Sequence, residues 1–192
     1  ITCAPGVTPR DKLLTMVGRP SDGLDIRIVD ADGRDVGAGA EGELRVRGPA
    51  IFYGYFAQPD LTAALFDDQG YFSTGDIATV DGDGYVRITG RSKDLVIRGG
   101  VNISPVPIED LLSSHPRVTT VAVVGYPDDR LGERICAVFG PGAEDLALAD
   151  VTAFCAEGGL GKHHWPEYVR HIPEMPMTPA GKIRKNDVRR WL

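Results

Sequence analysis

Residues 90–105 read GRSKDLVIRGGVNISP, and two different structural units are expected to meet in this segment. The alternating residues 84–89 before it are typical of a strand, and Ser104-Pro105 at its end is typical of a helix start. Adjacent opposite charges at Lys93-Asp94 and a glycine pair at Gly99-Gly100 indicate a connector between the two units. Polar side chains in a connector are free to meet a ligand, because the backbone around them is not all committed to a β-ladder.

The bulk composition indicates an ordinary globular protein. With 192 residues, 42% hydrophobic and 25% charged, the chain is long enough for one large or two small domains with their own cores. A formal net charge of -6 argues against general nucleic-acid binding, which needs a basic surface. No apolar run approaches the roughly 20 residues of a membrane span, so no transmembrane segment is expected.

The cysteines and the start of the chain indicate a cellular compartment. The first residues have neither the basic flank nor the apolar stretch of a signal peptide. Cys3, Cys136 and Cys155 form no C-x-x-C pair and leave one cysteine over, so we expect a reducing cytoplasm. Cys136 lies in an apolar run, which favours a buried structural thiol. Because the chain begins without methionine in a loop-like passage, it is interpreted as a fragment of a longer protein.

The first half of the chain predicts a small, mostly antiparallel β lobe. Turn-forming residues dominate 1–20, where a loop or extended segment is expected. A hairpin signal at residues 81–84 joins two predicted strands, and residues 60–66 predict a short capped helix. The predicted strands of this lobe are 24–30, 43–47, 77–80 and 85–89.

After the connector the pattern changes to that of an α+β domain. Residues 108–112 have helical spacing behind a Ser104 cap, with Pro105 at the first helical position. The further predicted elements are strands over 118–124, 134–139 and 168–172 and helices over 146–157 and 182–192. The sequence therefore predicts an α+β fold in which a small antiparallel β subdomain precedes a domain with a three-stranded central sheet.

Two polar residues near the end of the β lobe could bind a nucleotide. Asp76 follows Thr74-Gly75, a predicted turn that can present a carboxylate outward, and two acceptor oxygens suit a vicinal diol such as the hydroxyls of a ribose. Arg91 lies just past a predicted strand, where its fork of donors could meet a ribose or a phosphate. Taken alone, each is more typical of an ordinary surface residue.

Lys182 lies in a loop shaped by Pro176, Pro179 and Gly181. A compact cation on a flexible stem can neutralise a carboxylate and a phosphate together while they react. The structural alternative is a lysine that merely opens a basic helix, with Arg189 and Arg190 complementing the dipole at the helix end.

Two other signals do not indicate sites. Residues 158–162 resemble a phosphate-binding loop, but they lack the Walker spacing, and a helix C-cap followed by a turn explains them better. His163-His164 is not expected to bind a metal, because adjacent histidines point apart on a strand and no cysteine or carboxylate cluster joins them. We therefore expect no metal site in this chain.

Four motifs occur along the chain in a characteristic order. They are Gly42-Glu43-Leu44 with Gly48 and Gly54-Tyr55; Tyr71 with Thr74-Gly75-Asp76; Gly90-Arg91 with Lys93-Asp94, Gly99-Gly100, Ile103 and Pro105; and Pro176 with Thr178 and Gly181-Lys182. This order closely resembles the C-terminal part of the adenylate-forming superfamily, which includes acyl- and aryl-CoA synthetases, firefly luciferase and the adenylation domains of peptide synthetases. The resemblance covers nearly the whole chain.

The resemblance implies a two-step reaction. Enzymes of this superfamily join a carboxylic acid to ATP, giving an acyl-adenylate and pyrophosphate, and then swing the C-terminal domain and pass the acyl group to a thiol. It further implies that Asp76 and Arg91 hold the ribose of ATP and that Lys182 stabilises the transition state of the first step. Gly99 and Gly100 would face the pantetheine tunnel of CoA in the second step.

The resemblance also implies the domain organisation. Residues 1–91 would be the last β subdomain of the large domain, 92–93 the hinge with Lys93 as its pivot, and 94–192 the mobile domain. A hinge residue absorbs a large change in φ and ψ. The expected ligands are ATP, CoA and Mg²⁺, with the magnesium ligand, the phosphate loop and the acyl pocket upstream of this chain, so the chain alone should not form an adenylate.

The subfamily can be narrowed by the same motifs. Residues 97–105 and 178–182 resemble the CoA-ligase versions, and no carrier-protein sequence follows Leu192, so free CoA is the expected thiol acceptor. Fatty-acid, cyclohexanecarboxylate and benzoate types of CoA ligase fit equally. The alternatives are an adenylating enzyme of the peptide-synthetase or luciferase type and a non-catalytic fragment that keeps the fold.

One position departs from the family pattern. The family usually has glutamate where this chain has Pro107, and that glutamate completes a capping box with the serine. Proline is tolerated in the first turn of a helix but cannot return this hydrogen bond, a loss on the order of 1 kcal/mol. We expect the change to affect helix stability and no catalytic residue.

Overall fold

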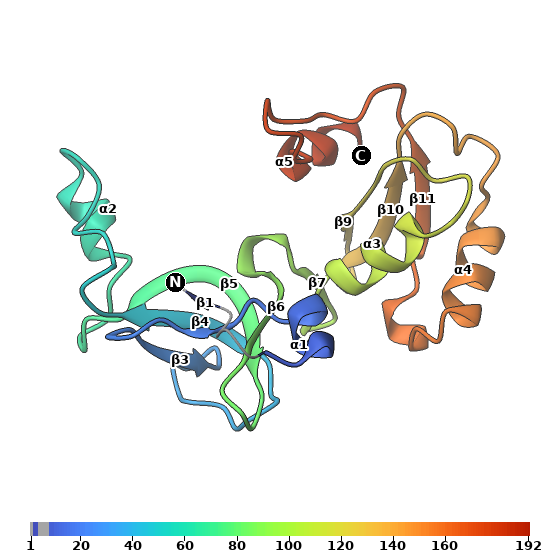
Figure 1. Ribbon diagram of the computed structural model, residues 1–192. Helices are drawn as coiled ribbons and strands as arrows, with labels where there is room; N and C mark the ends of the chain where they lie inside the picture. The colour runs from blue at the N-terminus through green and yellow to red at the C-terminus, as the bar shows by residue number, and fades with distance from the viewer. Residues whose placement is uncertain (1, 4–7) are drawn as a thin grey trace. The chain divides into compact units, whose positions relative to one another are not determined.

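In the computed structural model, which describes residues 2–3 and 8–192, the chain divides between Lys93 and Asp94 into two units, Ile1–Lys93 and Asp94–Leu192 (Figure 1). Each unit has its own β-sheet and its own buried apolar residues. Among the described residues, none of the helices has the length and apolar composition of a membrane span.

The first unit is built on a four-stranded antiparallel sheet in which neighbours in sequence are also neighbours in space. Its strands are β3 (Asp25–Val29), β4 (Gly42–Arg47), β5 (Phe72–Val80) and β6 (Val86–Arg91). Because side chains alternate across a sheet, one face supplies the buried cluster of Ile28, Leu44, Val46, Ala78 and Val86. The predicted antiparallel β lobe is confirmed, although β5 begins earlier than the sequence pattern indicated.

The described residues of the first unit also form four short elements. They are β1 (Thr2–Cys3), which pairs with β2 (Arg19–Pro20), and the helices α1 (Arg10–Thr15) and α2 (Pro59–Ala63). The expectation of a loop or extended segment throughout residues 1–20 was wrong for α1. Lys12 on this helix pairs with Asp81, 2.7 Å away, and with Asp83 in the loop between β5 and β6. An ion pair between such distant residues has no local sequence signal.

The second unit contains a five-stranded mixed sheet. Its strands are β7 (Val96–Arg98), β8 (Val101–Ile103), β9 (Val121–Asp128), β10 (Gly132–Phe139) and β11 (Tyr168–His171). The three predicted strands are β9, β10 and β11, and the α+β class is confirmed. The expected three-stranded sheet gains β7 and β8, because the connector folds into a hairpin and joins β10 at Gly132.

Helices cover both faces of this sheet. They are α3 (Val106–Ser113), α4 (Leu148–Glu157) and α5 (Lys185–Val188), and the short 3-10 turns are η1 (Ser92–Asp94), η2 (Lys162–His164) and η3 (Arg189–Trp191). Ile108 and Leu112 of α3 pack with Val123 in one cluster, whereas Val188 of α5 packs with Val124 in another. Adjacent strand residues face opposite sides, so α3 and α5 lie on opposite faces of the sheet.

Two helix predictions differ from the structure at their ends. The helix predicted over 182–192 begins only at Lys185 and continues after Val188 as the turn η3, because Lys182 lies in a tight turn. At α3, Pro105 is the residue before the first helical position, and the Ser104 hydroxyl still accepts a hydrogen bond from the Val106 N–H at 3.3 Å. Ser104, which was predicted to be the N-cap, therefore lies one residue before the observed N-cap, Pro105, and still accepts a hydrogen bond from the start of the helix.

Candidate functional site

Asp76, in the middle of β5, lies directly opposite Arg91, the last residue of β6. Asp76 is on a strand, not on the predicted turn, because β5 continues through Gly75. The Arg91 Nε lies 2.9 Å from the Asp76 Oδ1, so the two residues singled out from the sequence form an ion pair. The structure thus brings together the two side chains for which a nucleotide-binding role was predicted.

The backbone around Asp76 is fixed by side-chain hydrogen bonds. The Thr74 hydroxyl donates to the carbonyl oxygen of Leu44 at 2.7 Å and accepts from the Asp76 N–H at 3.0 Å. Gly75, between them, has a φ of 71°, which favours glycine, and its carbonyl oxygen accepts from the Ser92 hydroxyl at 3.2 Å. Thr74 and Ser92 therefore hold the Asp76 segment from both sides.

The pair retains bonding capacity for a ligand. The Asp76 side chain is 25% exposed and the Arg91 side chain 55% exposed. The 2.9 Å contact joins the Asp76 Oδ1 to the Arg91 Nε, and a carboxylate and a guanidinium each have further atoms that can accept from or donate to a ligand. One acceptor beside a fork of donors can bind the two hydroxyls of a vicinal diol.

Lys93 lies on η1, and its two neighbours, Ser92 and Asp94, contact residues of different units. On one side, Ser92 donates to Gly75 of the first unit. On the other side, the Asp94 Oδ1 lies 3.9 Å from the Arg189 Nη2 of the second unit. Lys93 itself is exposed, and no carboxylate in residues 2–3 and 8–192 forms an ion pair with it.

Lys182 lies in a tight turn that begins at Thr178. The Thr178 N–H donates to the carbonyl oxygen of Lys182 at 2.7 Å, and the Lys182 N–H donates to the Thr178 hydroxyl at 3.1 Å. Gly181 has a φ of 75°, which this turn requires. The Lys182 side chain is exposed, and within the described part of the chain its ammonium group has no ion-pair partner. It is therefore a cation held on a rigid turn and available to an anion.

Gly99 and Gly100 form the two-residue turn of the β7–β8 hairpin. Their φ values are 59° and 82°, the positive pair that a tight hairpin turn favours. The Gly99 N–H donates to the carbonyl oxygen of Leu131 at 2.7 Å, which holds the turn against the chain between β9 and β10. Ile97 and Val101 beside the turn are 54% and 58% exposed. The hairpin therefore presents bare backbone flanked by apolar side chains.

The signals that the sequence analysis rejected have structural explanations. Gly158 ends α4, and Gly159 follows with a φ of 76°, as expected for a helix C-cap with a turn. The histidines were expected to point apart on a strand, which is wrong: they lie on η2, and the centroids of the His163 and His164 rings are 4.0 Å apart. Among the described residues, no group of three histidine, cysteine or carboxylate side chains could hold a metal ion.

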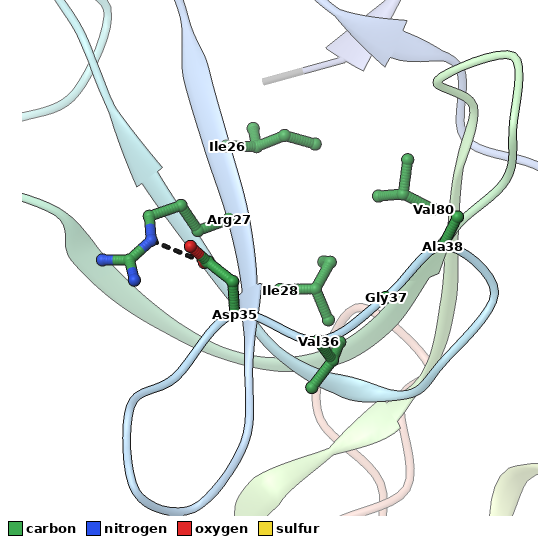
Figure 2. A pocket seen from close by; sticks show the side chains of 8 residues that line it. All are labelled: Ile26, Arg27, Ile28, Asp35, Val36, Gly37, Ala38 and Val80. Carbon is green, nitrogen blue, oxygen red and sulfur yellow. Dashed lines mark hydrogen bonds and ion pairs between the residues drawn. The ribbon is translucent and has the colours of Figure 1, made fainter.

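The cavity shown in Figure 2 lies elsewhere in the first unit and has a volume of about 340 Å³. Figure 2 shows Ile26, Ile28 and Val80 pointing into it and the Arg27–Asp35 ion pair beside it, with 2.7 Å between the Arg27 Nε and the Asp35 Oδ1. None of the predicted site residues lines this cavity. The candidate site therefore consists of exposed or half-buried groups on strands and turns.

Two charged residues that form an ion pair were not predicted from the sequence. Glu109 of α3 and Lys185 of α5 form an ion pair with 2.7 Å between the carboxylate and the ammonium group. Glu109 lies next to the apolar residues of α3, but the local sequence pattern does not indicate that Lys185 is its partner. Only the packing of α3 and α5 on the same strand reveals the pair.

Two models of one enzyme family match the two parts of the chain. Residues 107–182 match the AMP-binding enzyme C-terminal domain, and residues 1–56 match the AMP-binding enzyme. The chain belongs to the adenylate-forming superfamily. The superfamily resemblance stated from the four sequence motifs is thereby confirmed.

Relatives in the superfamily include enzymes with different thiol acceptors in their names. The medium-chain fatty-acid–CoA ligase of Escherichia coli is 40% identical over 92% of this chain and 32% of its own length. The salicyl-AMP ligase / salicyl-S-ArCP synthetase of Mycobacterium tuberculosis is also 40% identical, over 91% of this chain and 31% of its own length. The chain therefore spans about a third of the length of these superfamily members.

The solved structures of superfamily members show the same fold. The o-succinylbenzoate CoA synthetase of Bacillus subtilis, in complex with an acyl-adenylate intermediate, matches with a TM-score of 0.84 and 28% identity. This match covers 95% of the present chain and 37% of that structure.

Proposed function

We propose that the chain is the C-terminal part of an ATP-dependent acyl-CoA synthetase, which activates a carboxylic acid as an acyl-adenylate and then transfers the acyl group to CoA. The observation that carries the proposal is the Asp76–Arg91 pair, in which Arg91 ends β6 two residues before the boundary at Lys93. A diol-binding pair beside a boundary between two units suits an enzyme in which one domain moves over a bound nucleotide.

In the proposed adenylation step, each residue has a separate task. The Asp76 carboxylate accepts hydrogen bonds from the ribose hydroxyls of ATP, while Arg91 holds the carboxylate and donates to the nucleotide. Lys182 places its positive charge between the acid substrate and the α-phosphate, where negative charge develops as the oxygen–phosphorus bond forms and pyrophosphate leaves. The turn at Thr178 fixes the backbone of Lys182 before the reaction, so little reorganisation is needed.

In the proposed thioester step, the second unit turns about Lys93. The neighbours of Lys93 are bonded to different units, so a rotation of its backbone need break neither the Ser92–Gly75 hydrogen bond nor the Asp94–Arg189 ion pair. The β7–β8 turn then faces the pantetheine of CoA. Gly99 and Gly100 lack side chains that would obstruct its approach, and Ile97 and Val101 offer apolar contacts.

Mg²⁺ accompanies ATP in the proposed reaction as a counter-charge to the phosphates. The described residues provide no cluster of three ligating side chains for it, and Asp76 is paired with Arg91. We therefore assign no magnesium ligand to this chain, and the roles above do not pass through the metal.

A second candidate function is the transfer of an activated aryl acid to a carrier protein in place of CoA. It is favoured by the M. tuberculosis relative, whose identity to this chain equals that of the E. coli CoA ligase. The two functions are separated by supplying the full-length enzyme with free CoA and with a pantetheine-bearing carrier domain. A medium-chain fatty acid, salicylate and indoleacetate are the acids suggested by relatives of this chain.

The replacement Lys182→Ala tests the proposed function in the full-length enzyme. Acid-dependent exchange of pyrophosphate into ATP should fall roughly 100-fold to 1,000-fold, because a positioned charge is lost from the transition state. Thioester formation from supplied acyl-adenylate should stay near the wild-type rate.

The matched control for this experiment is Lys162→Ala. Lys162 is another exposed lysine of the second unit, and its removal should leave both steps nearly unchanged. An equal loss of both steps in Lys182→Ala would refute the role given to Lys182.

A further inference from the structure

The β9 strand has an open edge, which a single carboxylate covers. β9 pairs only with β10, so its other edge has no neighbouring strand among the described residues. The Val123 N–H at this edge donates to the Glu109 Oε1 at 2.6 Å, and the Lys185 Nζ lies 2.7 Å from the same oxygen. One oxygen of Glu109 thus binds both the sheet edge and a lysine of α5.

This ion pair joins helices that lie on opposite faces of the sheet. Ile108 and Leu112 anchor α3 on one face, and Val188 anchors α5 on the other. The Glu109–Lys185 pair passes around the edge of β9 and ties the two helices together. Because α5 is only one turn long, this tie and the burial of Val188 both help to anchor it.

The pair is largely shielded from water. The Glu109 side chain is 19% exposed and that of Lys185 15% exposed. Burial raises the pKa of Glu109, and the positive charge of Lys185 opposes that rise. Asp94 is the other acid near Glu109, and Arg189 is paired with Asp94. Removing either partner leaves a charge in a poorly hydrated place, so the pair holds its geometry firmly.

The chain between Lys182 and Lys185 is too short and too well bonded to move independently. Lys182 is bonded to Thr178, and the Arg184 N–H donates to the carbonyl oxygen of Pro176 at 2.8 Å. Lys185 follows at once and is held by Glu109.

We propose that Glu109 is a positioning residue for Lys182, acting through Lys185. This inference rests on the proposed function, in which Lys182 serves the adenylation step. Glu109 does not touch the reacting groups. Glu109 instead sets the position from which Lys182 reaches the reacting groups. The second step does not use Lys182 and therefore does not depend on Glu109.

The test is Glu109→Gln in the full-length enzyme, assayed separately for each half-reaction. Gln keeps the shape and an acceptor for the Val123 N–H but loses the charge that holds Lys185. Adenylation should fall roughly 10-fold to 100-fold, as expected for a misplaced catalytic group. Thioester formation from supplied acyl-adenylate should remain at the wild-type rate. Asp110→Asn on the exposed side of the same helix is the matched control and should change neither step.

A double-mutant cycle of Glu109→Gln with Lys182→Ala separates a positioning role of Glu109 from a simple loss of stability. If Glu109 acts only through Lys182, then Glu109→Gln should lower adenylation no further in the Lys182→Ala background. A full additional loss there, or an equal loss of both half-reactions in the single variant, would overturn the inference. If Glu109→Gln does not fold, Lys185→Met breaks the same pair from the other side and must show the same pattern.

The outcomes also distinguish this inference from the proposed function. If Lys182→Ala has no selective effect on adenylation, the proposed function itself fails. If Lys182→Ala behaves as expected and Glu109→Gln matches wild type, only the positioning role is overturned. Lys185→Arg, which keeps the charge, should retain most of the adenylation rate.

Discussion

At the scale of single residues, burial decides which polar groups can react. Cys136 is fully buried on β10, and burial raises the pKa of its thiol to about 11; burial also raises the pKa of the Cys155 thiol. The sequence had indicated a structural role for Cys136 from its apolar neighbours alone. Lys182 shows the opposite case, because it is exposed and has no ion-pair partner in the described part of the chain.

Burial of the cysteines predicts their chemical inertness. At pH 8, a thiol with a pKa of about 11 is thiolate in only about one molecule in a thousand. Iodoacetamide should therefore leave Cys136 and Cys155 unmodified in the folded 192-residue chain and modify both in guanidinium chloride. Peptide mass spectrometry reads each cysteine separately. Native-state modification of Cys136 at the denatured rate would contradict this assignment.

At the scale of elements, Glu167 joins three parts of the second unit. Its carboxylate binds the Arg98 guanidinium of β7 through two contacts, of 2.8 Å and 3.0 Å. The Arg134 Nη1 of β10 lies 3.2 Å away, and the backbone of Glu167 leads into β11. The Arg98 hydrogen bonds lower the pKa of Glu167 below its usual range.

A lowered carboxyl pKa predicts a specific dependence of stability on pH. The stabilisation by Glu167 is present above its unfolded-state pKa of about 4.5 and is lost as the pH falls through the lower folded-state value. At pH 7, Glu167→Gln should therefore lower the free energy of unfolding by about 1 kcal/mol, a value reduced for partial exposure. Urea titrations should show this difference shrinking below pH 4.5. Glu157→Gln, at an exposed end of α4, is the control, and a difference that stays constant down to pH 3 would be inconsistent with this account.

The elements also show what a sequence pattern can and cannot predict. Long apolar or alternating runs predicted that β9, β10 and β11 exist, because periodicity reports burial directly, although β9 begins and ends later than predicted. The three-residue strands β7 and β8 are too short for a period, and they are stabilised by pairing with each other and with Gly132. α1 was missed for a similar reason, since Lys12 finds its partners in a distant loop.

The candidate site was predictable in part, for the same physical reason. Ordered motifs singled out Asp76, Arg91 and Lys182, and the structure pairs the first two. The Glu109–Lys185 pair was not predictable, because it forms only after α3 and α5 have packed on opposite faces of one sheet. Residues that carry a motif can be found in a sequence, whereas residues that position them depend on the tertiary fold.

At the scale of the whole molecule, the proposed mechanism depends on a pivot. The chain divides at Lys93, and the residues on either side of it are bonded to different units. The proposed alternation requires the second unit to offer Lys182 in one step and the Gly99–Gly100 turn in the other. Both features belong to that unit but are held by different partners, Thr178 and Leu131.

The pivot can be measured directly in the full-length enzyme with spin labels at Glu41→Cys and Glu157→Cys, two exposed positions in different units. Double electron–electron resonance then gives the distance between the labels with ATP and the acid substrate, and again after CoA is added. Rotation about Lys93 predicts two distinct distances whose populations shift when CoA is added. A single distance that is the same under both conditions would contradict rotation about Lys93.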